Sequence, residues 1–267
     1  MSYRKLLVGL ADIETAPRVM LAAASLAATH GARIVGVHVV PAGTTQQSGL
    51  PLAVLGDRLR DIFEDARHAR AFSGHWQVIE DSELSAGGAL VELGNTCDAL
   101  ILGQRHAREA GRSGWHLGEH VVGATARPVL LVPDGGEREF TTERVLVAWN
   151  GNAESTRAVF DALPLLQLAT HVRIHRFNPP PSERAHDAGM AEDLAATLAR
   201  HGVAVELSQS TVSVFEIGEE ILALARDIDA DLLVSGCRIH SRLRESLFGS
   251  TTRHLFEQSN RPLLMGG

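Results

Sequence analysis

The residue types best suited to holding an anion lie together near the end of the chain. A short apolar run, 232–234, is predicted to be a strand that stops at Gly236, and a segment rich in arginine, 238–244, comes next. The last predicted helix then opens with a glycine and two hydroxyl residues, Gly249, Ser250 and Thr251. Backbone N–H groups and hydroxyls at a helix start, beside arginine side chains, are groups that bind phosphate. The segment is therefore a candidate phosphate-binding loop.

The same residues also fit a purely structural role. Ser250 is of a type that caps helices, and the arginines, Arg238 among them, are able to pair with surface carboxylates such as Glu245. The sequence leaves both interpretations open.

Other patterns that carry chemistry are weaker. His116 and His120 are predicted to share one helix face, but no third metal ligand is evident, so we expect no metal site. The sequence has no Walker A motif, no Gly-x-Ser-x-Gly and no evident pair of catalytic carboxylates. We therefore expect no catalytic residues and no enzyme, with slow ATP hydrolysis the one activity left open.

Composition narrows the class of protein. The net charge of −7 over 267 residues argues against nucleic-acid binding. Two cysteines, Cys97 and Cys237, indicate no disulfide framework, which favours the cytoplasm. No apolar run is long enough to span a membrane, and Asp12 and Glu14 interrupt the one stretch that resembles a signal peptide.

The elements that position the candidate loop alternate between strand and helix. Strands are predicted at 4–10, 33–40, 75–80, 98–102, 128–132, 145–149, 171–177, 203–207, 231–234 and 262–265. Helices are predicted at 17–30, 57–72, 86–96, 153–163, 183–201 and 215–227. The segment 41–56 is predicted to be a loop, and Pro164 is predicted to end the helix before it.

The order of elements repeats once. Three matching segments recur in the same order at a nearly constant separation, beginning at Lys5 and Arg144, at Asp98 and Asp231, and at Arg127 and Arg261. We expect two tandem α/β units, 1–136 and 141–267, each a mostly parallel sheet covered on both faces. Such sheets bind ligands at the carboxyl ends of their strands, where Asn150 and Gly236 are predicted to lie.

The chain resembles the universal stress protein family, specifically its tandem two-domain members. Nucleotide-binding members carry Gly, two residues, Gly, nine residues, then Gly-Ser or Gly-Thr. Gly236, Ile239 and Gly249 followed by Ser250 keep that spacing here. The resemblance covers essentially the whole chain. It implies two flavodoxin-like, doubly wound, five-stranded units that pack as a pseudo-dimer, with ATP or a related adenine nucleotide in the crevice.

The chain departs from the family pattern at two positions of the second unit. Ile239 stands where the second glycine belongs, and a β-branched residue resists the backbone geometry that glycine allows. Asn150 replaces an acidic residue that contacts the nucleoside in the family, although it keeps hydrogen-bonding capacity. In the first unit, Glu119 follows Gly118 where a hydroxyl would lie, and Ala11 aligns with the acidic position, so we expect no phosphate site there.

Together these observations predict a cytoplasmic stress-response protein that binds an adenine nucleotide in its second unit. The resemblance implies a nucleotide site made by Asn150, Gly236, Arg238, Ile239, Gly249, Ser250 and Thr251. Dimerisation through exposed edge strands is a further expectation. Two alternatives stay open, a ligand-free protein-interaction scaffold in which Ile239 fills the crevice, and a slow nucleotide hydrolase.

Overall fold

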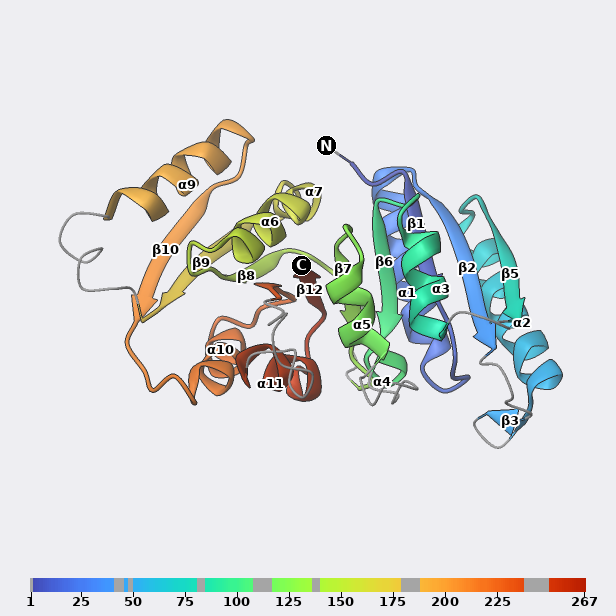
Figure 1. Ribbon diagram of the computed structural model, residues 1–267. Coiled ribbons are helices and arrows are strands. Elements are labelled where there is room, and N and C mark those ends of the chain that lie inside the picture. The colour runs from blue at the N-terminus through green and yellow to red at the C-terminus, as the bar shows by residue number, and fades with distance from the viewer. Residues whose placement is uncertain are drawn as a thin grey trace. The chain divides into compact units, whose positions relative to one another are not determined.

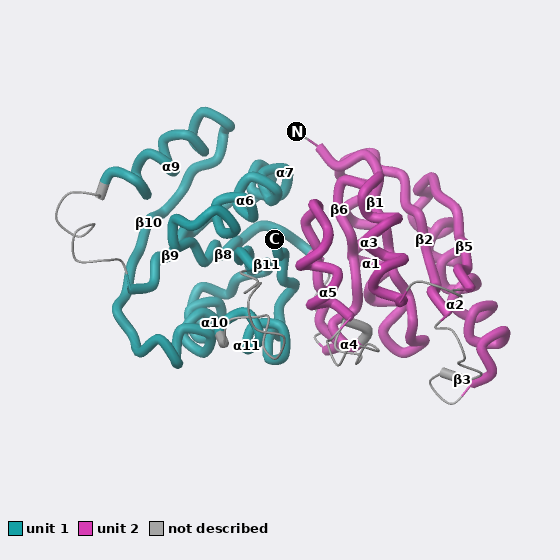
Figure 2. The backbone as a smooth tube through the Cα atoms, viewed as in Figure 1, with its two compact units in different colours: residues 1, 141–267 teal, residues 2–140 magenta. Residues whose placement is uncertain are grey.

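The chain divides into two compact units, residues 2–140 and residues 141–267 (Figure 2). A computed structural model describes residues 2–40, 46–47, 50–80, 85–107, 117–135, 140–178, 188–237 and 250–267, with the side chains of 46–47, 106–107, 188 and 250 left out.

The first unit is built on five parallel strands in the order β7-β6-β1-β2-β5 (Figure 1). The strands are β1 Lys5–Gly9, β2 Arg33–Val40, β5 Gly74–Glu80, β6 Ala99–Gly103 and β7 Val129–Val132. Its helices are α1 Ala16–His30, α2 Leu52–Arg70, α3 Ala86–Gly94, α4 Gln104–Ala107 and α5 Leu117–Ala124. A short antiparallel pair, β3 Gln46–Gln47 and β4 Leu50–Pro51, precedes α2.

The second unit repeats this order as β10-β9-β8-β11-β12, again all parallel. Its strands are β8 Arg144–Ala148, β9 His171–Phe177, β10 Val205–Ser210, β11 Leu232–Gly236 and β12 Leu263–Gly266. Its helices are α6 Ala153–Asp161, α7 Leu163–Leu166, α9 Ala188–Arg200, α10 Ile217–Asp227 and α11 Ser250–Gln258. Helices α6 and α9 lie on one side of the sheet, and α10 and α11 on the other (Figure 1).

The central strands of both sheets are buried because helices cover both faces. Every residue of β6 is buried, as are four of the five residues of β11. Both strands are nearly continuous aliphatic runs, which is typical of parallel strands without a solvent face. The fold class predicted from the sequence, a doubly wound α/β fold with five mostly parallel strands in each unit, is confirmed.

Matched hydrogen bonds show the repeat in atomic detail. The carboxylate of Asp98 accepts the backbone N–H of Lys5 at 2.9 Å, and that of Asp231 accepts the N–H of Arg144 at 2.9 Å. In return, the N–H of each aspartate donates to the carbonyl of the same partner at 2.8 Å. Each aspartate thus aligns the fourth strand of its unit with the first.

Several element boundaries differ from the sequence prediction. Helix α2 begins at Leu52, inside the segment predicted to be a loop, and its first turns bury Leu55 completely. Pro164 does not end a helix but lies in the first turn of α7, where its missing N–H has no intrahelical partner to lose. The helix predicted from residue 215 begins at Ile217, which leaves Phe215 90% exposed.

Helices α4 and α5 were not among the elements predicted from periodicity. Between them, residues 108–116 lie outside the described part of the chain, as do residues 183–187 of the helix predicted at 183–201. Among the residues that the structure describes, no helix combines the length and apolar character needed to cross a membrane.

Candidate functional site

The turn between β8 and α6 places Asn150 at the carboxyl edge of the second sheet. The side-chain oxygen of Asn150 accepts the backbone N–H of Asn152 at 3.2 Å and the hydroxyl of Ser155 at 2.8 Å. Gly151 between them adopts a φ of +79°, a conformation that glycine reaches at little cost. The turn is therefore held in one shape by side-chain contacts.

These contacts fix the orientation of the Asn150 amide. A backbone N–H can only donate, so the atom that faces Asn152 must be the oxygen Oδ1. The Nδ2 group then points the other way. It donates no hydrogen bond within the described part of the chain, and Asn150 is exposed. Asn150 thus presents two free N–H donors at the carboxyl edge of the sheet.

Asn152 starts α6 by capping it. Its side-chain oxygen accepts the backbone N–H of Ser155 at 2.7 Å, which is the usual geometry of an asparagine N-cap. The pattern Asn-x-x-Ser in the sequence is a signal for this cap. Asn152 and Ser155 hold Asn150 in place, and neither is among the site residues predicted from the sequence.

Gly236 lies against the first turn of α6. A Cβ added to Gly236 would overlap the backbone nitrogen of Ser155 and would lie 2.6 Å from the carbonyl carbon of Glu154. The position requires glycine because β11 and α6 approach so closely. The structure therefore brings Asn150 and Gly236 to the same place, with Ser155 in contact with both. It also gives Gly236 a packing role that does not depend on any ligand.

The remaining predicted site residues lie at or beyond the limit of what is described. Arg238, Ile239 and Gly249 are outside the described residues. Ser250 is the first residue of α11, and Thr251, the second, is partly buried. Because α11 connects the carboxyl end of β11 to the amino end of the parallel strand β12, the N-terminus of α11 belongs to the same edge as Asn150.

The corresponding edge of the first unit is occupied by an arginine among carboxylates. Arg105 donates from Nη1 to Glu14 at 2.7 Å and to Asp12 at 3.4 Å, and its backbone N–H donates to Asp134 at 2.8 Å. The hydrogen bond that Arg105 donates to Glu14, and then the charge of Asp12, raise the pKa of Arg105. Three carboxylates around one guanidinium leave an excess of negative charge, which disfavours a phosphate at this edge.

Asp12 makes the same kinds of hydrogen bond in the first unit that Asn150 makes in the second. One oxygen of Asp12 accepts the N–H of Glu14, two residues later, at 3.2 Å, and the other accepts the hydroxyl of Thr15 at 3.0 Å. The sequence alignment placed Ala11 at this position, and the structure corrects it. The loop from β1 to α1 is longer than the loop from β8 to α6, so an ungapped alignment cannot match the two side chains.

The histidines of the described residues form no metal site. His175 is buried between two hydroxyls, with Nδ1 at 2.9 Å from Ser208 Oγ and Nε2 at 2.9 Å from Ser210 Oγ. Burial lowers the pKa of His175, and the charge of Arg173 lowers it further. His116 lies outside the described residues, and the rest of the described chain brings no three His, Cys, Asp or Glu side chains together as a metal site.

Comparison with known proteins identifies related chains. A sequence model of the universal stress protein family matches residues 2–133 and 141–265. A universal stress protein of Synechocystis sp. is 30% identical over 184 residues, which is 66% of this chain and 60% of the relative, so the match spans less than two thirds of the relative's length.

Solved structures show the same fold. A universal stress protein from Archaeoglobus fulgidus has a TM-score of 0.71 at 15% identity, over 98% of this chain and 97% of that one. A putative universal stress protein from Pseudomonas aeruginosa has a TM-score of 0.62 at 15% identity, over 99% and 93% of the two chains.

Proposed function

Since the chain belongs to the universal stress protein family and contains two of its units in tandem, we propose that it is a stress-response protein whose second unit binds ATP or a related adenine nucleotide. In this proposal the protein is regulatory rather than enzymatic and acts in the cytoplasm. Self-association through its edge strands belongs to the same proposal.

The observation that carries the proposal is the exposed amide of Asn150. Its oxygen is engaged by Asn152 and Ser155, and its Nδ2 group faces outward at the edge where parallel sheets bind ligands. A pair of positioned donors at this edge suits the hydroxyl oxygens of a ribose or the ring nitrogens of a base. An ionised acidic residue, the type that the family resemblance implies at this position, would offer only acceptors there.

The phosphates are assigned to the loop that begins at Gly236 and ends at α11. Gly249, Ser250 and Thr251 would supply backbone N–H groups and hydroxyls at the helix start, where the helix dipole contributes about 0.3–1 kcal/mol toward a bound anion. Arg238 would add a charge-assisted hydrogen bond. Ile239 limits the affinity, because it replaces a glycine in this loop.

The first unit is proposed to bind no nucleotide. Its carboxyl edge carries Asp12, Glu14 and Asp134 around Arg105. Arg105 follows β6 as Arg238 follows β11, so the arginine that would meet a phosphate in the second unit is engaged by carboxylates in the first.

Calorimetric titration with ATP tests the proposal. We expect saturable heat with a thermal shift of the unfolding transition, since a ligand of the folded state raises its stability. No heat and no thermal shift at millimolar ATP would exclude nucleotide binding and favour the interaction scaffold. Measurable ATP turnover that disappears in Arg238→Ala and Ser250→Ala would instead identify a slow hydrolase.

A further inference from the structure

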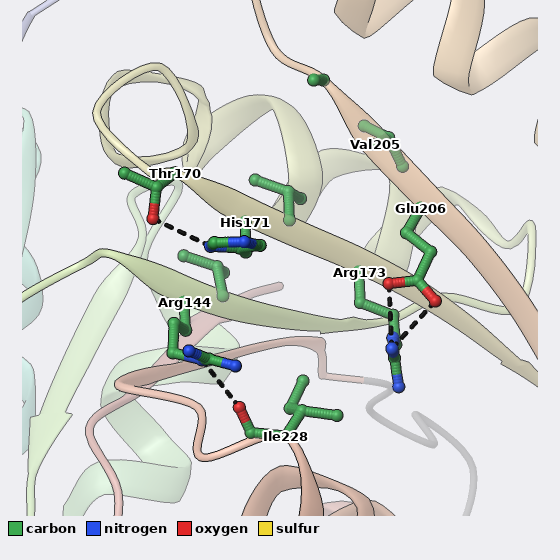
Figure 3. Close-up of a pocket in the computed structure, with 10 residues that line it drawn as sticks. Arg144, Thr170, His171, Arg173, Val205, Glu206 and Ile228 are labelled. Atoms are coloured by element: carbon green, nitrogen blue, oxygen red, sulfur yellow. Dashed lines mark hydrogen bonds and ion pairs between the residues drawn. The ribbon is translucent and has the colours of Figure 1, made fainter.

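A pocket of the second unit lies at the edge of the sheet where its strands begin, opposite the edge that carries Asn150. It has a volume of about 250 Å³ and is lined at the amino ends of β8, β9 and β10 and by Ile228, which follows α10 (Figure 3). The polar side chains on its wall are those of Arg144, Thr170, His171, Arg173 and Glu206. None of them belongs to the site proposed for the nucleotide.

Both arginines of this pocket have guanidinium N–H groups that make no hydrogen bond in the described residues. Arg144 is exposed, and within the described part of the chain its guanidinium donates only from Nε, to the carbonyl of Ile228 at 2.9 Å (Figure 3). Arg173 donates from one nitrogen, Nη2, to both oxygens of Glu206 at 2.8 Å. Nη1 of Arg173 makes no hydrogen bond in the described part of the chain, and its buried Nε has no partner there either. Because Nη2 is engaged by Glu206 and Nε is buried, Nη1 is the donor of Arg173 that is left for an oxyanion.

The charges around the pocket leave a positive excess. Glu206 balances Arg173, whereas Arg144 pairs with no carboxylate side chain in the described residues. The exposed His171 adds a nitrogen 3.0 Å from the hydroxyl of Thr170. Aliphatic residues make up the rest of the wall: Val145, Val172, Ala204, Val205 and Ile228. The wall therefore suits a single negative group joined to a small apolar body.

The first unit provides an internal comparison. Arg173 is the third residue of β9 and pairs in register with Glu206, whereas the third residue of β2 is Val35, which pairs in register with His75. Val35 is only 4% exposed. An apolar, buried position of one repeat is thus a charged position in the other. The fold does not require an arginine at this position, since Val35 takes the place of Arg173 in the first unit, where Arg33 at the start of β2 contacts His75 instead.

We propose that this pocket binds a small organic anion, with one carboxylate or phosphate group held by Arg144 and Arg173 and a short aliphatic body against the valines. The pocket is smaller than the roughly 300–1,000 Å³ of sites for drug-sized ligands, so its volume suits a ligand smaller than a nucleotide. The site is independent of the proposed nucleotide site, and either one can fail without the other.

Calorimetry with four small probes tests the site on the full chain. Isovalerate and isobutyl phosphate share a branched body and distinguish the two oxyanions. Inorganic phosphate lacks the body, and isobutylamine lacks the negative charge. We expect saturable binding of at least one of the two organic anions, at least tenfold weaker binding of inorganic phosphate, and none of the amine.

Substitutions then locate the binding. Arg144→Met and Arg173→Met should each weaken binding of the organic anion at least tenfold. Arg144→Lys should reduce the affinity less than Arg144→Met because lysine keeps the positive charge. Lys5→Met, at the equivalent position of the first unit, is the matched control and should leave the affinity for the organic anion unchanged. None of these variants should change the affinity for ATP. Thermal unfolding of each variant shows that it is folded.

Three results would overturn the proposal. One is the absence of saturable binding by either organic anion at millimolar concentration. The second is binding that survives both Arg144→Met and Arg173→Met. The third is equally tight binding of inorganic phosphate, which would indicate an adventitious ion only.

Discussion

The backbone N–H of Asn152 donates to the side-chain oxygen of Asn150 across 3.2 Å, and this contact decides which end of the Asn150 amide faces outward. The same oxygen accepts the hydroxyl of Ser155. As a result, Oδ1 of Asn150 stabilises the turn, and Nδ2 is left to donate to a ligand. The two roles of this residue are separable by experiment.

Replacing Asn150 with alanine is expected to affect both stability and binding. Asn150→Ala removes the acceptor for Asn152 and Ser155, and the unfolding free energy should fall by about 1 kcal/mol. ATP affinity should fall about tenfold through loss of the Nδ2 donors, which corresponds to roughly 1.4 kcal/mol. Urea unfolding and ATP calorimetry measure the two effects. The exposed Asn260→Ala is the control, and an Asn150→Ala protein with unchanged ATP affinity would remove Asn150 from the site.

Gly236 is predicted to tolerate no side chain. Gly236→Ala brings a Cβ into the backbone of Ser155, and overpacking of this kind costs about 1–3 kcal/mol of unfolding free energy. Gly189→Ala is the matched control, because among the described residues no atom outside its own helical turn lies within 4 Å of the added Cβ. Alanine is also the better helix former, worth up to about 1 kcal/mol. Urea unfolding should show a loss for the first variant and none for the second. Equal stability of the two would contradict the close approach of β11 to α6.

Ile239→Gly is predicted to tighten nucleotide binding. A β-branched residue in a loop built for glycine carries about 1–2 kcal/mol of backbone strain where φ is positive, so its removal should lower the Kd for ATP about tenfold. Ile239→Ala separates the effect of side-chain bulk from that of backbone strain, since alanine removes the bulk but keeps the Cβ. We expect calorimetry to rank the affinities glycine, alanine, isoleucine. Weaker binding by the glycine variant would show that isoleucine contributes to the site.

Acid should destabilise the first unit through His38. His38 is fully buried in β2, with Nδ1 2.9 Å from the carbonyl of Leu10, and Nε2 has no partner in the described residues. Burial lowers the pKa of His38, although the bond to Leu10 raises it in part. The unfolded chain therefore takes up a proton below about pH 6.5 that the folded chain does not yet bind, and the unfolding free energy falls as the pH drops further.

The measurement for His38 is urea unfolding at pH 7.5 and at pH 5.5. His38→Gln should reduce the difference in unfolding free energy between pH 7.5 and pH 5.5, while substitution of the exposed His201, His201→Gln, should not. His30 and His175 also have lowered pKa values, so part of the acid sensitivity should remain. A difference that is identical in wild type and His38→Gln would contradict the assignment.

Most of the fold was predictable from the sequence, because the pattern of apolar residues that marks each strand or helix lies within a short segment of the chain. Short runs rich in apolar residues marked all ten strands of the two sheets, and three recurring segments marked the duplication. The start of α2 at Leu52 was missed, since glycine and proline nearby are equally typical of a loop. Pro164 was read as the end of a helix, although proline is also common in the first turn of the next one.

The candidate site was less accessible to sequence reasoning because it depends on orientation and on distant residues. Asn150 and Gly236 were predicted by spacing, but no spacing shows which end of an amide is free. The ion pair of Arg105 with Asp12 joins residues 93 positions apart. It was hidden further by the extra length of the loop before α1, which aligned Ala11 with Asn150.

The central claim is that one nucleotide site exists, in the second unit, and two arginines at equivalent positions test it most directly. Arg105 and Arg238 each lie two residues after the glycine that ends a fourth strand, Gly103 or Gly236. Calorimetry with ATP should give one site per wild-type chain, lost or at least tenfold weaker in Arg238→Ala and unchanged in Arg105→Ala. Two sites per chain, or a site that survives Arg238→Ala and disappears in Arg105→Ala, would contradict the account.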